Sequence, residues 1–279
     1  MTAANSRKKE FLPKILIVAF LLIVAVLVVF PYTLMLLTSF RSTQEILRNP
    51  DRIWPITWTV SGYIKVFTRA PFFKWFINSV TITVSVTVAV LFTSSLTGFV
   101  FAKYKFKHKD TLFLIILATM MVPSQVTMIP SFLIVNWLGL YNKLSALIIP
   151  ALVSSFGIFL CKQFIEDIPD SLCESAKIDG AADFTIYLKI ILPQIRPAIG
   201  SLAIFTFLGT WNDYLGPLIM LSEVERMTLP LALSFFNSQH STDISATMSA
   251  ATLVMLPVTI VFIAFQKQFI KGVSLTGIK

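Results

Sequence analysis

The sequence predicts an all-α integral membrane protein with six transmembrane helices. Of its 279 residues 56% are hydrophobic, and the mean hydropathy is +0.79. A soluble domain is only about 45–50% apolar even when glycine is counted. The apolar residues also form long uncharged runs, and a helix needs only about 20 such residues to cross a bilayer. A water-soluble core could not bury this surplus.

Six runs account for the predicted spans. Three contain no charged residue, and they cover residues 15–40, 75–102 and 111–142. Three shorter runs follow, covering residues 144–161, 197–222 and 244–266, with Asp213 interrupting the second of them. The first run is too long for a removable signal peptide and lacks a small-residue cleavage site. We therefore expect the first helix to stay in the mature protein.

Prolines divide several of these runs. Pro31 is expected to bend the first helix and Pro257 lies inside the sixth, since neighbouring helices can satisfy the freed carbonyl. Residues 111–142 are more than one crossing requires, and they contain Pro123 and Pro130. Part of this run is predicted to lie as an external hairpin or interfacial helix that ends near Gly139.

Basic residues indicate the orientation. The net charge is +9, but the basic residues lie beside the spans rather than on one surface, which argues against nucleic-acid binding. The positive-inside rule places both termini in the cytoplasm. The segments on that side then hold Arg7, Lys8, Lys9, Lys14, Lys103, Lys105, Lys107, Lys109, Lys162, Lys177, Lys189, Arg196, Lys267, Lys271 and Lys279.

The first external loop departs from this pattern. Between residues 41 and 74 it carries Arg41, Arg48, Arg52, Lys65, Arg69 and Lys74. Its aromatic residues, together with the first of the second span, are expected to anchor the chain at the membrane interface. They are Trp54, Trp58, Tyr63 and Trp75.

The segment between the fourth and fifth spans, residues 163–197, is predicted to fold as helix, hinge and helix. Ser171 and Glu174 fit a capping box at the start of the first helix, and Gly180 fits its end. Asp183 is placed to cap a second helix over residues 184–191, which Pro193 is expected to stop. The segment is therefore a structured cytoplasmic element.

Small residues follow one another on the first of these helices. Ser175, Ala176 and Gly180 recur at spacings of one and four, so one helix face carries little side-chain bulk. Another protein could approach this face closely.

These residues resemble a known family. Glu174-Ser175-Ala176, three residues, Gly180, nine residues and then Ile190 to Pro193 are similar to the cytoplasmic EAA loop of permeases in binding-protein-dependent ABC importers. The family pattern has alanine where this chain has Ser175. Further segments resemble the carbohydrate-uptake branch, in particular its maltose-type second permease subunit. They are residues 121–130, Trp211-Asn212-Asp213-Tyr214 and the C-terminal residues 269–279.

The resemblance implies a single permease domain over residues 1–279 in a bacterial or archaeal plasma membrane. Its implied partners are a second homologous permease, two ATPase subunits, an extracytoplasmic solute-binding protein and membrane lipid. The segment 163–197 would dock on an ATPase and couple ATP hydrolysis to alternating access. The coupling residues implied are Glu174, Ser175, Ala176, Asp179, Gly180, Leu192 and Pro193. ATP and Mg would be bound by the partner ATPase, because this chain has no phosphate-binding glycine loop.

Three polar residues are candidates for the translocation pathway: Gln125, Asn212 and Asp213. A charge at the bilayer centre costs about 2.5–3.5 kcal/mol, so Asp213 is functional, paired with a neighbour, or close enough to the outer end to be hydrated. Gln125 and Asn212 fit interhelical hydrogen bonding equally well.

The remaining reactive residues do not indicate an enzyme. Cys161 and Cys173 are expected to be buried free thiols, and His108 and His240 lie in separate predicted loops, which excludes a paired-histidine metal site. No catalytic motif is present. An ion-coupled secondary transporter or channel is the alternative, with Asp213 in its favour. The sequence does not name the solute.

Overall fold

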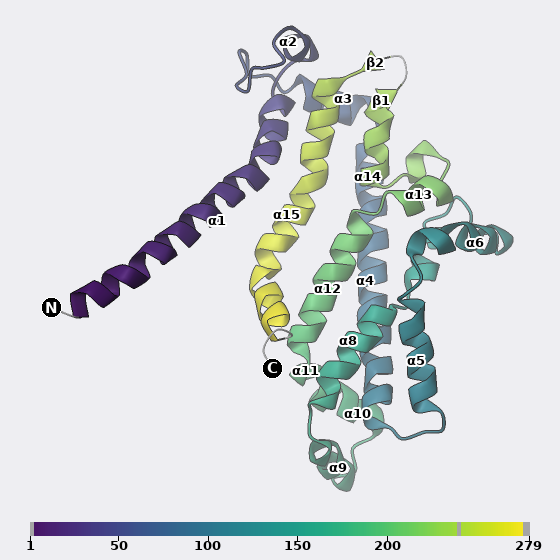
Figure 1. Cartoon of the computed structure of the whole chain (residues 1–279). Helices are drawn as coiled ribbons and strands as arrows, with labels where there is room; N and C mark the ends of the chain where they lie inside the picture. The colour runs from purple at the N-terminus through teal and green to yellow at the C-terminus, as the bar shows by residue number, and fades with distance from the viewer. Residues whose placement is uncertain (1–2, 239–240, 276–279) are drawn as a thin grey trace. The chain divides into compact units, whose positions relative to one another are not determined.

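The computed structural model describes the backbone of residues 3–238 and 241–275, and the side chains of residues 14–236 and 243–266. His240, the basic side chains near both termini and the family-like segment from residue 269 onward lie outside these described side chains. The chain divides into two compact units, residues 1–70 with 233–254 and residues 71–232 with 255–279. Figure 1 shows the course of the chain.

The first unit contains three helices of the N-terminal segment: α1 (Ala3–Ser39), α2 (Thr43–Arg48) and α3 (Ser61–Arg69). It also contains η4 (Leu233–Phe236), the hairpin of β1 (Asn237–Ser238) and β2 (Ser241–Thr242), and the start of α15 (Ile244–Leu275). α1 continues through Pro31, and its apolar span is exposed on this chain. Side chains so apolar belong against lipid or another subunit.

Polar contacts join α1, α3 and α15 inside this unit. The Ser39 hydroxyl bonds the Tyr63 hydroxyl at 2.7 Å, and Ser249 donates to the Ser39 carbonyl at 3.1 Å. Asp243 accepts from Lys65 at 2.6 Å and from the Thr43 hydroxyl at 2.7 Å. The start of α15 is therefore fixed against the end of α1, the start of α2 and α3.

The predicted external loop 41–74 contains more structure than its composition suggested. Arg41 is 2% exposed and pairs with Glu45 at 3.0 Å. It also donates to the carbonyls of Asn49 at 2.8 Å and Arg52 at 2.6 Å. One of the six basic residues assigned to this loop is thus a buried structural residue.

The second unit is built on α4 (Phe72–Lys103), α8 (Ser155–Glu166) and α12 (Arg196–Trp211), which pack side by side (Figure 1). Small residues allow their close approach. A Cβ atom at Gly98 would lie 2.8 Å from Cys161 Cβ, and one at Gly157 would collide with Ser94. Buried apolar residues of all three helices form one cluster with Ile168, Cys173 and Ile186.

Trp75 corrects one prediction. It was expected to be an interfacial anchor, but it is 1% exposed and its Nε1 donates to the Val224 carbonyl at 2.6 Å. Trp54 and Trp58 are exposed, as an interfacial role requires. Trp75 is buried because it lies in the first turn of α4, where α4 meets η3 (Val224–Arg226).

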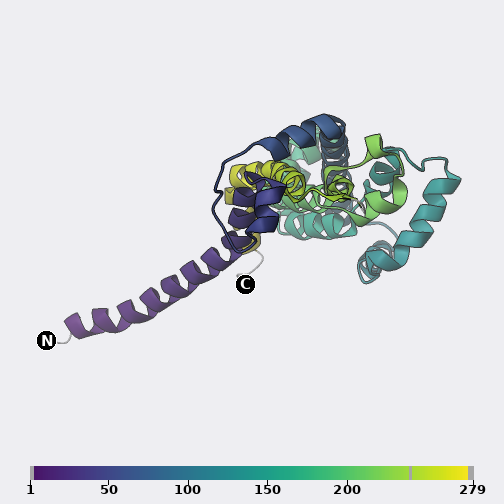
Figure 2. The ribbon, with the colours of Figure 1, turned by 90° about the horizontal axis from the view of Figure 1, so that it is seen from above.

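The run 111–142 folds as two helices, α5 (Lys109–Thr119) and α6 (Ser124–Trp137), whose axes differ by 98°. Figure 2 looks down on the second unit and shows α6 lying across the view. Pro123 caps α6 rather than breaking it, and Gly139 follows the helix with a φ of +68°. The bend separates α6 from the direction of α5, and the interfacial position of α6 stays a prediction.

The fourth predicted span consists of α7 (Ser145–Ile148), η1 (Ile149–Ala151) and α8, and together they cover Ser145–Glu166. The fifth run is divided into α12 and α13 (Leu215–Met220), followed by η3 and α14 (Leu229–Ala232). Within the described residues four helices are long and apolar enough to cross a membrane, or up to six if each bent pair is one span. The all-helical membrane class is confirmed, and the count of six stays a prediction.

Candidate functional site

The segment 163–197 folds as the predicted helix, hinge and helix. Its first helix, α9, covers Asp170–Ile178, and Pro169 stands at its N-cap. No side chain caps this end, and Ser171 lies inside the helix rather than before it. The predicted capping box of Ser171 and Glu174 is therefore wrong, because the N-cap is Pro169, two residues before Ser171.

Gly180 ends α9 as predicted. Its φ is +80°, its amide donates to the Lys177 carbonyl at 3.0 Å, and the Ala181 amide donates to the Ala176 carbonyl at 2.9 Å. This pair of bonds is a Schellman motif, which satisfies the last carbonyls of a helix and requires a left-handed residue. A Cβ atom at Gly180 would meet nothing within 4 Å. The glycine is needed for its backbone conformation, not for space.

The second helix of the segment is longer than predicted. It starts as α10 (Asp183–Ile186), widens into a π-helical turn over Tyr187–Ile191, and ends as α11 (Leu192–Gln194). Asp183 does not cap it, and Pro193 does not stop it. A π turn shifts the amide partners by one residue, as the Leu192 amide donates to the Tyr187 carbonyl. Pro193, which has no amide proton, therefore follows without breaking the helix.

The chain bends after α11. Between α10–α11 and α12 the axis turns by 81°, and Pro197 lies in the first turn of α12. Ile195, at the corner, is 1% exposed. The segment 163–197 thus continues into α12 through one packed corner.

Lys103 fastens α9 to the end of α4. Its Nζ donates to the Ile168 carbonyl and to Asp170 Oδ1 at 2.7 Å, and its side chain is 6% exposed. The ammonium group lowers the pKa of Asp170 below its usual range. Because the pKa of Asp170 is lowered in the folded state, the ion pair stabilises the fold at neutral pH. This stabilisation is lost as the pH falls from the pKa of an ordinary aspartate through the lowered pKa of Asp170.

A second contact joins the two helices of the segment to the same end of α4. Lys177 pairs with Asp183 at 3.2 Å and lies 5.2 Å from the centre of the Tyr104 ring. Burial, and then the adjacent Asp183 carboxylate, raise the pKa of Tyr104 to about 12. The phenol therefore stays protonated and donates to Asp183, whose own pKa is lowered by that bond. α9 and α10 are connected through α4.

Lys103→Met tests this attachment. Losing the ammonium group leaves the Ile168 carbonyl without its donor, and we expect α9 to become more mobile while the bundle stays folded. Amide exchange in residues 170–178 should rise at least about tenfold, which corresponds to 1.4 kcal/mol. Lys105→Met, at an exposed neighbouring position, is the matched control and should change nothing. Equal exchange in both variants would contradict the attachment.

The outward face of α9 is the part of the segment available to another protein. Glu174, Ser175 and Asp179 are exposed, and Ile178 is 86% exposed. The face of small residues does not form as predicted, because Ala176 packs against the apolar cluster. Ile178 gives this exposed face an apolar side chain, but a single exposed isoleucine is normal on a protein surface and does not by itself mark a contact.

Both cysteines are free and buried, as predicted. Cys173 is 8% exposed, and burial raises the pKa of its thiol. Cys173 therefore belongs to the anchoring face of α9 and not to its free face.

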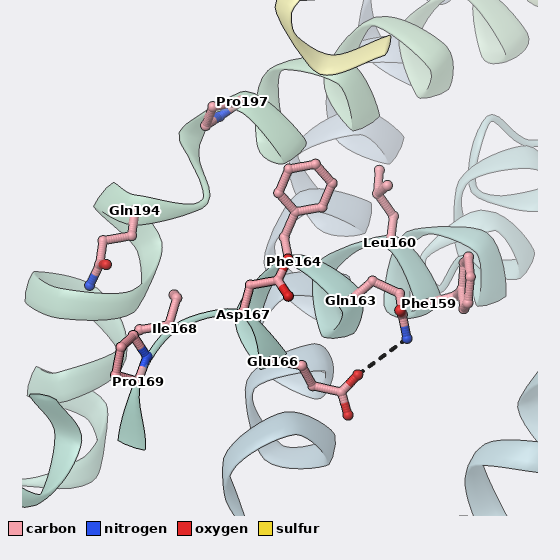
Figure 3. Close-up of a pocket in the computed structure, with 10 residues that line it drawn as sticks. All are labelled: Phe159, Leu160, Gln163, Phe164, Glu166, Asp167, Ile168, Pro169, Gln194 and Pro197. Atoms are coloured by element: carbon pink, nitrogen blue, oxygen red, sulfur yellow. Dashed lines mark hydrogen bonds between the residues drawn. The ribbon is translucent and has the colours of Figure 1, made fainter. Parts of the chain in front are cut away.

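A cavity of about 660 Å³ lies where the two ends of the segment 163–197 meet. Figure 3 shows its lining: α8 contributes Gln163 and Phe164, the turn after it contributes Asp167, and Gln194 and Pro197 come from the bend. Gln163 donates to Glu166 at 3.2 Å. The cavity therefore lies between α8 and the side chains of Gln194 and Pro197, which flank the buried Ile195 at the corner.

Two of the three candidate pathway residues share a second cavity. Gln125 of α6 and Asp213 both line a space of about 510 Å³. Asp213 lies in the break between α12 and α13, where its carboxylate accepts the Gly216 amide at 3.1 Å. The residue is exposed and lies outside a continuous helix, which favours the hydrated alternative over a charge in the middle of a span. Asn212 does not line this cavity.

Sequence reasoning missed several residues of this region. Lys103 was counted only among the basic residues that set the orientation in the membrane. Its position before a polar loop also allows a hydrogen bond to a distant part of the chain. Thr83 and Thr228, which line a third cavity together with Asp213, belong to no motif in the sequence. Only the fold brings residues 83, 213 and 228 together.

Comparison with known proteins identifies the class. Residues 94–275 match the model of the family "Binding-protein-dependent transport system inner membrane component". The arabinooligosaccharide transport permease AraQ of Bacillus subtilis is 35% identical over 270 residues, covering 95% of this chain and 96% of that protein. The lactose transport permease LacG of Rhizobium radiobacter is 31% identical over 261 residues, covering 94% and 95%.

A solved structure shares the fold. It belongs to a bacterial ABC transporter that imports the acidic polysaccharide alginate, and it superposes with a TM-score of 0.81 at 22% identity over 96% of this chain and 99% of that one. This likeness shows that the two chains share a fold. The chain belongs to the family of inner membrane components of binding-protein-dependent transport systems.

Proposed function

We propose that this chain is the membrane-spanning permease subunit of an ATP-driven importer and moves a saccharide into the cytoplasm. Family membership and the sugar permeases among its relatives support this function, and an ion-coupled transporter is not supported. The observation that carries the mechanism is α9, whose inner face is fixed to α4 while its outer face is exposed.

The coupling proposal follows from that geometry. An ATPase subunit would contact Glu174, Ser175, Asp179 and the exposed Ile178, and Ala176, Gly180, Leu192 and Pro193 would hold the segment in shape. Displacement of α9 would reach α12 through α10, the π turn and the corner at Ile195. ATP and Mg would be bound by the ATPase, and this chain would contribute no cofactor site.

The same proposal includes the assembly. The exposed apolar face of α1 supports contact with lipid or with a second, homologous permease, and the family description supports dependence on an external solute-binding protein. The two units would act as one permease domain, with residues 163–197 and both termini on the cytoplasmic side. Reporter fusions test the orientation, and a C-terminal reporter that is active only outside the cytoplasm would overturn it.

Uptake by the reconstituted importer tests the function. The permease, its partner permease, the ATPase and the binding protein should take up a radiolabelled saccharide into vesicles when ATP is inside. Arabinotriose and lactose are the first solutes to try, because relatives are named for such sugars. Uptake that follows an ion gradient and ignores ATP would contradict the proposal.

A further inference from the structure

Three threonine side chains and a carboxylate surround a small cavity between α4, α12 and α13. The cavity measures about 210 Å³, and its polar lining consists of Ser79, Thr83, Thr210, Asp213 and Thr228. Thr83 is 1% exposed and Thr228 is 5% exposed. Polar groups buried to this degree are expected to be hydrogen-bonded.

Two of these hydroxyl groups have no protein partner. Within the part of the chain whose side chains are described, Thr83 Oγ1 and Thr228 Oγ1 are buried and make no hydrogen bond. Ser79 is different, since its Oγ accepts the Leu229 amide at 2.8 Å. A buried hydroxyl without a partner costs about 1–3 kcal/mol. Because Thr83 and Thr228 line a cavity, their hydroxyl groups are available to a hydroxyl group of a ligand.

Asp213 connects this cavity to the larger one beside α6. It borders both spaces, as do Leu147 and Ala151. The larger cavity adds the polar side chains of Ser124, Gln125, Thr127 and Ser131. Hydroxyl and amide groups of this kind both donate and accept hydrogen bonds, as the hydroxyl groups of a saccharide do.

The charge of the lining is one-sided. Asp213 is the single charged side chain among the described residues that line the two cavities, and no lysine, arginine or histidine balances it. A carboxylate that lines a cavity opposes the binding of an anion there, because like charges repel one another. Such a site favours neutral polyhydroxylated solutes over anionic ones.

We propose that Thr83, Thr228 and Asp213 form a subsite of this chain for the hydroxyl groups of a neutral saccharide, and that the subsite discriminates against acidic saccharides. The inference rests on the proposed importer function and adds a solute class to it. It contrasts with the acidic polysaccharide carried by the transporter of the same fold.

Valine substitutions test the subsite because they keep the shape of threonine and remove its hydroxyl group. In the complete importer, Thr83→Val and Thr228→Val should each raise the KM for uptake of arabinotriose or lactose at least about threefold. Thr87→Val is the matched control. Thr87 lies one turn along α4, and its hydroxyl group is also buried without a partner, but it lines neither cavity. If the KM of Thr83→Val and of Thr228→Val is no higher than that of Thr87→Val, the two hydroxyl groups do not bind the saccharide, and the subsite is overturned.

The charge of Asp213 needs a measurement that does not depend on the binding protein. In a chain carrying Cys161→Ala, Cys173→Ala and Thr228→Cys, methanethiosulfonate reagents of similar size should react at rates ordered by charge. Relative to free cysteine, the anionic reagent should be at least about tenfold slower than the neutral one. Adding Asp213→Asn should reduce this ratio below about threefold.

The outcomes separate the subsite from the importer function. An anionic reagent as fast as the neutral one, or a Thr228→Cys thiol that no reagent reaches, would overturn the subsite even if ATP-driven uptake is normal. Absence of ATP-driven uptake would overturn the importer function, while the reagent rates would still measure the charge selectivity of the cavity.

Discussion

Gly180→Val is expected to abolish coupled uptake while the protein still inserts and assembles. A β-branched residue at a φ of +80° costs about 1–2 kcal/mol or more, and relief of that strain would undo the Schellman bonds that end α9. The outer face of α9 would then point elsewhere. ATP hydrolysis by the assembled importer should no longer respond to the loaded binding protein.

Gly139→Val is the matched control for this effect. Gly139 also has a positive φ, +68°, and a Cβ atom there would likewise meet nothing within 4 Å. It follows α6, far along the chain from the coupling segment, so the same backbone strain should lower abundance without changing the coupling of what remains. Normal uptake and normal stimulated hydrolysis in assembled Gly180→Val importer would contradict the role given to α9.

Arg41→Met is expected to have the largest effect on folding. It removes the partner of a carboxylate that is 8% exposed, and an unpaired buried charge costs about 3–5 kcal/mol. Burial alone would raise the pKa of Glu45, but bonds from the Ile56 amide and from Arg41 keep that pKa below its usual range. Membrane abundance should fall severalfold, since whole domains are stable by only about 5–15 kcal/mol.

Two further variants define the cause. Arg48→Met removes an exposed arginine of the same segment and should leave abundance unchanged. Arg41→Met with Glu45→Gln removes both charges and should recover part of the loss. Because the pKa of Glu45 is lowered in the folded state, the wild-type pair stabilises the fold at neutral pH and loses this effect as the pH falls through the lowered pKa of Glu45. If Arg41→Met is as abundant as the wild type, the buried pair is not structural.

The sequence predicted those features that depend on local chemistry. Apolar runs located the helices that are long and apolar enough to cross a membrane, and Gly180 could be recognised because a left-handed turn admits few residues. The position of α6 followed from Pro123 and the excess length of its run. Such signals are contained in a few neighbouring residues.

The errors arose where distant residues decide the outcome. Ser171 and Asp183 have capping chemistry, but Pro169 starts α9, and Tyr104 and Lys177 engage the Asp183 carboxylate. Trp75 is buried by a segment about 150 residues away along the chain. The cavity around Thr83 and Thr228 likewise exists only after α4 and α12 pack. No local pattern contains these contacts.

Thiol labelling at Ser175 tests the coupling claim most directly. Ser175 is exposed on α9, whereas Cys173 is buried and would report on this chain's own packing. In a chain carrying Cys161→Ala, Cys173→Ala and Ser175→Cys, a polar maleimide should react at least about tenfold more slowly when the ATPase is bound. The exposed control, Ser222→Cys, should react equally in both cases. Equal labelling of Ser175→Cys with and without bound ATPase would contradict the account.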